Sequence, residues 1–278
     1  MDIGDFIDYI AKDSLKTLMP LGIKRIRLIE DSLDHEYLLF TGQLYQITPY
    51  LEALRDIVER FELIEEKFFK IYPVIKGIIW NIVKPKEKEK YFKIVVNAYK
   101  NLKKYIDIGY DFSIDYYSGI IFYEMGSKYF DEYAKKMISI IGNKNLVTLD
   151  PHTTYALKVL YKRIDSGFNS QIHHYSEFIK PNNLKDFVDH ESCYLNRYLN
   201  ISLINDATKP QHSGKETGCC GGPIELISPR LATEIAKTRI EELLSTGKRK
   251  VLVWCPICLS NLSRLGLAEV YDALEISQ

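Results

Sequence analysis

Residues 248–265 read KRKVLVWCPICLSNLSRL. A basic turn leads into the apolar run Val251–Trp254, which predicts a buried strand, and the Cys255-Pro256 step after it predicts the start of a helix. The N–H groups and the dipole at a helix N-terminus stabilise a thiolate charge. Cys255 and Cys258 are therefore predicted to sit at such a terminus.

An earlier stretch of the chain repeats this layout. Residues 143–160, NKNLVTLDPHTTYALKVL, again give a basic turn, an apolar strand, an X-Pro step and a helix. Small-residue turns upstream also correspond, which favours tandem copies of one supersecondary unit. The matched segments are 143–160 with 248–265, 117–119 with 219–221, and 41–51 with 191–201.

The alternation of strands and helices predicts an α/β fold of two tandem strand–helix units with mostly parallel sheets. The first half also carries an extra helical segment, residues 63–105, broken by a charged turn near Lys84-Pro85. We expect one unit over residues 1–150 and the other over residues 151–278. The other expected elements are strands at 37–40, 146–149 and 172–175, and helices at 48–61, 120–141, from 153, and 224–244.

The two copies differ where chemistry is expected. Gln43 corresponds to Cys193, the pair Tyr117-Ser118 corresponds to Cys219-Cys220, and Asp150 and Thr153 correspond to Cys255 and Cys258. Only the second copy carries thiols.

All five cysteines fall in the last 86 residues, and the first 192 residues contain none. Thiolates are soft ligands suited to iron–sulfur clusters and zinc. A tetrahedral structural zinc takes four ligands, whereas a cluster with several irons can use a fifth. Three other interpretations stay open: a zinc site, a thioredoxin-like redox pair, and cysteines that only pack in the core.

The side chains of two adjacent cysteines on one helix or strand point in different directions. Cys219-Cys220 therefore predicts a turn, and Gly218, Gly221 and Gly222 supply its backbone freedom.

Composition excludes two broad classes. Lysine plus arginine equals aspartate plus glutamate at 37 each, so no net field attracts nucleic acid. The segment MDIGDFIDYIAKDSL lacks the basic and apolar regions of a signal peptide, and the most apolar tract, residues 71–83, is too short to cross a bilayer. We expect a cytoplasmic chain that is not inserted in a membrane.

The pattern Cys193, Cys219-Cys220-Gly221 and Cys255-Pro-Ile-Cys258 resembles the cysteine-rich CCG domain found in the B-type subunit of heterodisulfide reductase and in its relatives. Those relatives include iron–sulfur subunits of glycolate oxidase, lactate utilisation proteins and some archaeal succinate dehydrogenases. The resemblance extends over about residues 35 to 265. Its other segments are LLFTGQLYQITPYLEAL (38–54), DYYSGIIFYEMG (115–126) and LVTLDPHTTYALK (146–158).

This resemblance implies a degenerate first CCG copy and a second copy that holds one non-cubane [4Fe-4S] cluster on all five cysteines, with zinc as the lesser alternative. The implied function is electron transfer to or from a disulfide, thiol or sulfane-sulfur substrate. The implied partners are a ferredoxin-like subunit of the heterodisulfide reductase C type and a flavoprotein subunit. The chain would be free in the cytoplasm or peripheral to a membrane complex. The alternative is a non-catalytic docking subunit, with zinc or a single cluster, of a larger complex such as an archaeal succinate or lactate dehydrogenase.

Other residues are candidates through their position alone, and none is assigned a catalytic role. His190 precedes Cys193 by three residues and is a candidate hydrogen-bond donor to cluster sulfur. His152 is either a remnant ligand or substrate contact, or a hydrogen-bonded histidine at a helix start. Gln43, Tyr117 and Arg197 are candidates to line the cleft between the copies.

Overall fold

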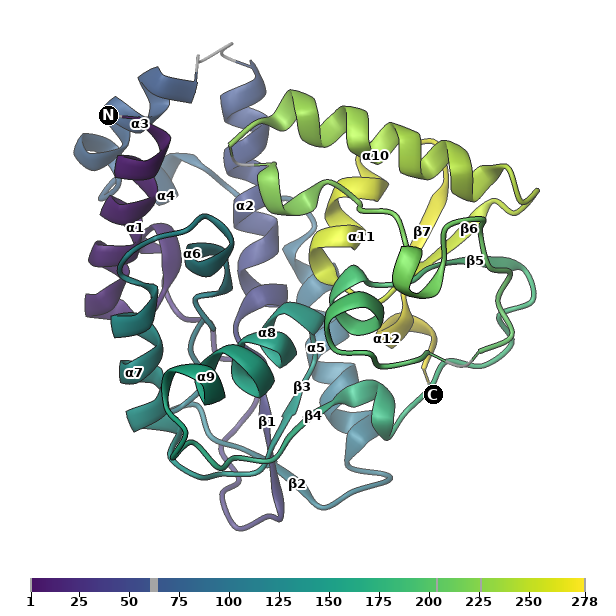
Figure 1. Cartoon of the computed structure of the whole chain (residues 1–278), viewed down its shortest axis with the longest axis horizontal. Helices are drawn as coiled ribbons and strands as arrows, with labels where there is room; N and C mark the ends of the chain where they lie inside the picture. Colours follow the sequence, from purple (N-terminus) through teal and green to yellow (C-terminus); the bar gives the residue numbers. More distant parts are fainter. Residues whose placement is uncertain (1, 61–64, 204, 226, 278) are drawn as a thin grey trace.

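The computed structural model describes residues 2–60, 65–203, 205–225 and 227–277 (Figure 1). Among these residues, no helix has both the length and the apolar character needed to span a bilayer. The strands are β1 Tyr37–Phe40, β2 Ile108–Tyr110, β3 Leu146–Thr148, β4 Ile172–His174, β5 Phe187–His190, β6 Lys250–Val253 and β7 Glu269–Asp272. The helices are α1 Ile3–Thr17, α2 Leu44–Arg60, α3 Glu65–Ile75, α4 Ile79–Ile82, α5 Lys88–Leu102, α6 Ile120–Glu124, α7 Phe130–Ile141, α8 Pro151–Tyr155, α9 Lys162–Ile164, α10 Pro229–Leu244, α11 Pro256–Ser263 and α12 Ala273–Ile276.

The strands form two parallel sheets with the same internal order. The first sheet runs β2-β1-β3-β4, and the second runs β5-β6-β7. A parallel bridge from Val188 of β5 to Thr208 occupies the place in the second sheet that β2 occupies beside β1. The expected α/β fold with a tandem repeat of strand–helix units is therefore confirmed.

Short buried strands form the centre of both units. All three residues of β3 are buried, as are Val251–Val253 of β6. Apolar runs of this kind are typical of parallel strands that helices cover on both faces. The chain passes from the first sheet to the second between residues 174 and 187, and we call the part of the chain up to β4 the first unit and the part from β5 onward the second unit. The division at residue 150 stays a prediction about domains.

Helices α3, α4 and α5 lie in the chain between α2 and β2 and make up the extra helical segment of the first half. In Figure 1, α2 runs between the two units, where it packs against α11 of the second. Two buried side-chain contacts join the units here: the Tyr45 hydroxyl donates to Asp272 at 2.9 Å, and Arg55 pairs with Glu225 at 3.2 Å.

Several expected helices have different bounds from those predicted. The expected helix over residues 120–141 is two helices, α6 and α7, because Gly126 takes a left-handed φ of +69° and Ser127 turns back to bond the Phe122 carbonyl. The expected helix from residue 224 begins instead at Pro229, which can start a helix because it needs no intrahelical N–H bond. The expected helix over 48–61 is α2, which begins four residues earlier, at Leu44, and residue 61 lies outside the described residues.

Candidate metal centre

Cys255 and Cys258 stand where the strand–Cys-Pro pattern predicts. Cys255 is the N-cap residue of α11, in extended conformation, and Pro256 begins the helix. Cys258 lies in the first turn, and both residues are buried. Cys193 follows the end of β5 by three residues, and β5 pairs in parallel with β6. Both segments therefore leave the same edge of the second sheet, which is the edge where parallel α/β sheets bind ligands.

Cys219 and Cys220 lie in a turn, as expected, and neighbouring atoms leave no room for a side chain at Gly221 or Gly222 of that turn. Gly221 has φ +80°, and a Cβ there would lie 2.6 Å from the Ala232 carbonyl oxygen of α10. A Cβ on Gly222 would lie 2.2 Å from a methyl carbon of Ile257. The Gly221 N–H donates to the Cys219 sulfur at 3.3 Å, and the Gly222 N–H donates to the Cys220 sulfur at 3.4 Å.

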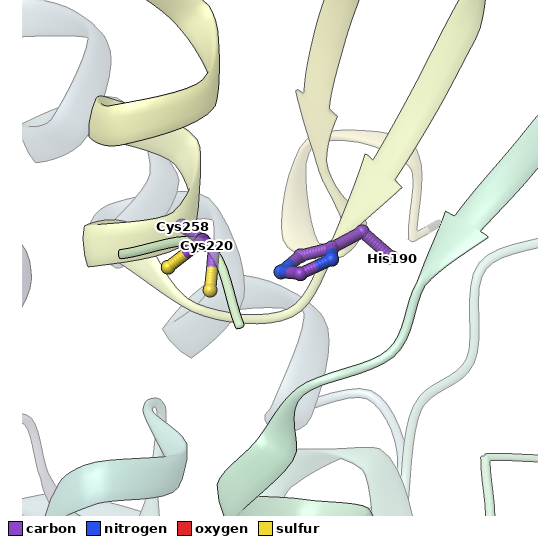
Figure 2. Close-up of side chains that lie close together, drawn as sticks. All are labelled: His190, Cys220 and Cys258. Atoms are coloured by element: carbon purple, nitrogen blue, oxygen red, sulfur yellow. The ribbon is translucent and has the colours of Figure 1, made fainter. Parts of the chain in front are cut away.

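The five cysteines come together in one cluster. The sulfurs of Cys220 and Cys258 and a ring nitrogen of His190 all lie within 4.8 Å of one another (Figure 2). Cys258 also hydrogen-bonds Cys255, and Cys219 hydrogen-bonds Cys220. Cys193 lies close enough for the charges of Cys220 and Cys255 to affect its thiol. The structure thus connects residues separated by up to 65 positions in the chain.

Without a metal, the cluster divides into thiolates and thiols. Hydrogen bonds from Cys219 and Cys258 hold the pKa of Cys220 well below its usual value, against the effect of burial. Burial opposes ionisation of Cys255 too, but the hydrogen bond from Cys258 and the charge of His152 lower its pKa to about 5. Burial raises the pKa of Cys193 to about 11. A metal binding here would displace the remaining thiol protons, since thiolates are the ligands.

His190 faces the cluster as a hydrogen-bond donor. The Arg239 guanidinium donates to its Nδ1 at 3.0 Å. Because a guanidinium has no acceptor and keeps its protons, Nδ1 must be the acceptor, and a neutral His190 then carries its proton on Nε2. A nitrogen that carries a proton donates to a thiolate such as Cys220 and cannot bind a metal. The role expected for His190 from the sequence, a hydrogen bond to a cluster sulfur, stays a prediction.

His152 reaches the cluster from the first unit. It is buried in the first turn of α8, hydrogen-bonds Cys255, and lies 3.3 Å from a carboxylate oxygen of Glu124. Burial lowers the pKa of His152, but the charges of Cys255 and Glu124 outweigh burial and raise it well above its usual value. Its ring packs on Tyr194 with centroids 4.2 Å apart. Sequence spacing identifies neither Glu124 nor Arg239, because both are distant in the chain from the groups they orient.

The three remaining candidates have different surroundings. Gln43 is fully buried, and its side chain bonds Asp115 and the backbone of Ile26, so its bonds lie within the first unit. Tyr117 lines a cavity between the units. Arg197 is not among the described residues lining that cavity, and it donates instead to the carbonyls of residues 215 and 217 next to the Cys219 turn.

The cavity beside the cluster is mostly apolar, with Glu124 and His152 as its polar groups nearest the cysteines. Its second-unit wall includes Gly222 and Ile257, which directly adjoin ligand candidates. The full lining is Leu44, Leu51, Tyr117, Ile120, Ile121, Glu124, His152, Gly222, Pro223, Glu225 and Ile257.

In the first unit, hydroxyl and carboxyl groups occupy the positions that correspond to the cysteines. The Thr153 hydroxyl donates to Ser118 at 3.5 Å, and the Thr153 N–H donates to Asp150 at 2.8 Å. In the part of the chain that the structure describes, His190, Cys220 and Cys258 are the one group of three histidine, cysteine or acidic donors close enough to share an ion.

Residues 188–263 match the family model of the cysteine-rich domain called CCG. The match runs from β5 through α11 and contains all five cysteines. No curated protein matches the chain. The match and the clustered donors together indicate a metal-binding protein of redox type.

Proposed function

We propose that this chain is an iron–sulfur redox subunit resembling the B-type subunit of heterodisulfide reductase. It holds one [4Fe-4S] cluster on Cys193, Cys219, Cys220, Cys255 and Cys258, and transfers electrons to or from a disulfide, thiol or sulfane-sulfur substrate. The observation that carries the proposal is the convergence of five thiols from three separate segments, of which Cys220, Cys255 and Cys258 are buried.

The donor set suits a cluster better than a mononuclear ion. Five sulfurs exceed the four ligands of a structural zinc, and thiolates are the ordinary ligands of iron–sulfur clusters. His190 offers a proton rather than a lone pair, because Arg239 occupies its other nitrogen. A zinc site built on His190 would have to break that buried contact.

When bound, the cluster would supply a site that gains and loses single electrons. The chain's own residues set the surroundings of that site. His190 donates toward Cys220, and His152, oriented by Glu124, donates toward Cys255. Hydrogen bonds to ligand sulfurs favour the reduced state and so raise the reduction potential. The substrate would approach the ligands from the side of the cavity lined by Tyr117 and His152.

Electrons must come from other proteins, because the sequence shows no flavin, nicotinamide or ferredoxin motif. The proposed partners are a ferredoxin-like subunit of the heterodisulfide reductase C type and a flavoprotein subunit. The assembly would lie in the cytoplasm or at the periphery of a membrane complex.

A second candidate is a docking or structural subunit of a larger redox complex, such as an archaeal succinate or lactate dehydrogenase. Two observations favour it. Cys258 hydrogen-bonds both Cys220 and Cys255, and Cys219 hydrogen-bonds Cys220, so these four thiols match the donor number that zinc accepts. The first unit has hydroxyls where a second cluster would need thiolates.

Metal analysis with electron paramagnetic resonance on anaerobically purified protein tests the proposal. We expect about four irons and four sulfides per chain and a cluster signal. Cys220→Ser should abolish metal binding, because Cys220 contacts Cys219, Cys258 and His190. Cys219→Ser, at the edge of the cluster, should retain more metal. One zinc without iron would refute the cluster and support the structural subunit.

A further inference from the structure

The cluster of cysteines comes nearest to solvent on one side. Cys219 is the exposed cysteine, with its sulfur turned toward Cys220, and Cys193 is half-buried. The other three cysteines are buried. Electron tunnelling weakens steeply with distance, so an electron carrier gains most by docking on the side of Cys219 and Cys193.

Three tyrosines form a connected patch on that side, which we call the tyrosine patch: Tyr155, Tyr194 and Tyr198. Tyr194 and Tyr198 belong to the single helical turn that follows Cys193. The ring centroids are 5.2 Å apart for Tyr194–Tyr198, 5.2 Å for Tyr155–Tyr194 and 5.8 Å for Tyr155–Tyr198. Tyr198 is 53% exposed, Tyr155 is half-buried and Tyr194 is buried, so Tyr198 is the ring of the patch that a partner can cover directly.

The patch continues inward to the ligands. The ring of Tyr194 packs against the ring of His152 at a tilt of 35°, and His152 hydrogen-bonds Cys255. A carrier seated on Tyr198 would therefore contact a continuous path of packed rings that ends at a ligand candidate.

Positive charge borders the tyrosine patch. Arg197 lies between Tyr194 and Tyr198 in the chain and is exposed, and its guanidinium bonds the backbone that leads to Cys219. Arg163 is exposed and lies 5.4 Å from the ring of Tyr123, which hydrogen-bonds Tyr155. The four segments involved, residues 123–124, 155–165, 193–199 and 213–219, have a net charge of +2 with Glu124 included, whereas the whole chain has none.

We propose that the tyrosine patch with Arg163 and Arg197 is the docking surface for an acidic electron-carrier protein. Tyrosine and arginine are the residues most enriched at the centres of protein interfaces. The positive rim would steer an acidic carrier to this face and raise the association rate. In the transfer, the reduced carrier loses one electron and the oxidised centre gains it, and no bond is made or broken. The electron-transfer part of this inference rests on the proposed iron–sulfur function, whereas the binding part does not.

A reduced plant-type [2Fe–2S] ferredoxin, which is a small acidic protein, is the probe. Its oxidation by the anaerobically purified chain is followed by stopped-flow absorbance at several salt concentrations. We expect the second-order rate to fall as salt rises, and the double variant Arg163→Glu/Arg197→Glu to lower it about tenfold at low salt. Tyr198→Ala should weaken ferredoxin binding with little change in the salt dependence.

Matched controls separate docking from damage to the centre. Tyr105→Ala removes a tyrosine that is 58% exposed after α5, and should leave the rate unchanged. Reduced methyl viologen is a small cation, so it should reduce the charge-reversed variant no more slowly than the wild type. Equal rates with ferredoxin for wild type and the double variant would overturn the proposal, as would a wild-type chain that does not bind ferredoxin.

Binding of oxidised ferredoxin to the same variants, measured by calorimetry, needs no cluster. If metal analysis finds zinc but the double variant still loses ferredoxin binding, the proposed iron–sulfur function fails and the docking surface stands. If iron is present but binding is insensitive to Arg163, Arg197 and Tyr198, the docking surface fails alone.

Discussion

Gly221 is the residue at which the Cys219-Cys220 turn presses against α10, and its replacement by alanine tests how that turn is held. The residue has φ +80°, and an added Cβ would lie 2.6 Å from the Ala232 carbonyl oxygen and 3.1 Å from the Ile235 Cβ. The Ala232 oxygen belongs to the backbone of α10, and the Ile235 Cβ is bonded directly to it, so neither atom can move without shifting α10.

Two costs add in Gly221→Ala. A left-handed backbone costs a residue with a Cβ about 1–2 kcal/mol. The overlap with α10 adds about 1–3 kcal/mol, which is typical of an overpacked site. Gly247→Ala provides the matched control, because Gly247 has φ +81° but nothing within 4 Å of its added Cβ. We therefore expect Gly221→Ala to lower the free energy of unfolding by about 2–5 kcal/mol and Gly247→Ala by only about 1–2 kcal/mol.

The assay is urea unfolding of the metal-free protein, followed by tryptophan fluorescence. Trp254 is suited to this because it is buried and lies directly before Cys255. The metal content of each variant is measured in parallel. We expect only Gly221→Ala to lose bound metal. Equal stability of the two alanine variants would refute the contact with α10 as the reason for glycine at position 221.

Two further predictions concern the buried contacts between the units. Burial raises the pKa of Asp272 to about 8, although hydrogen bonds from the Leu274 N–H and the Tyr45 hydroxyl oppose it. The folded state then keeps a proton that the unfolded state releases near pH 4, so stability falls as pH rises from about 4 to 8, by up to about 5 kcal/mol. Asp272→Asn should remove this decline, and parallel urea midpoints for wild type and variant between pH 5 and pH 8 would contradict the assignment. Arg55→Met leaves the Glu225 carboxyl buried without its ion pair and should lower the free energy of unfolding by about 3–5 kcal/mol. The double variant Arg55→Met/Glu225→Leu should recover most of that loss in the same urea assay, and a double variant no more stable than Arg55→Met would count against the ion-pair account.

The sequence was sufficient to predict the strands that precede an X-Pro step. The runs at 146–149 and 251–254 are apolar, and the proline that follows each run marks where the strand ends and the next helix begins. The helical pattern over 120–141 was misleading because apolar residues keep their spacing on both sides of Gly126. The spacing of apolar residues alone cannot show that a residue between them has a left-handed backbone conformation.

Strand β5 could not be recognised, because its sequence, FVDH, is half polar although all four residues are buried. Asp189 accepts from the Trp254 indole at 2.8 Å and pairs with Lys209 at 2.7 Å. His190 is bonded by Arg239. These partners are 20 to 65 residues away in the chain, so the burial of β5 is a property of the tertiary structure and not of its own composition.

Sequence alone could likewise identify some residues of the candidate centre but not others. The cysteines could be singled out from residue type, because thiols that avoid two thirds of the chain indicate a site by themselves. Arg239 and Glu124 could not, because a charged residue on a helix usually faces solvent. Only the fold shows that these two side chains turn inward and orient the histidines.

The unit without cysteines contributes a histidine beside the cysteines. The two histidines at the cluster come from different units: His190 belongs to β5, and His152 lies in the first turn of α8 of the first unit. His190 and Cys220 therefore keep their contact whatever the second unit does relative to the first. The contact of His152 with Cys255 depends on the fit between the units, which the Arg55–Glu225 pair helps to hold. Strain at that boundary would change the hydrogen bond to Cys255 and leave the one to Cys220 intact. The first unit thus has a physical role beside the cysteines, since it supplies one wall of the cavity and the histidine contact that depends on how the units meet.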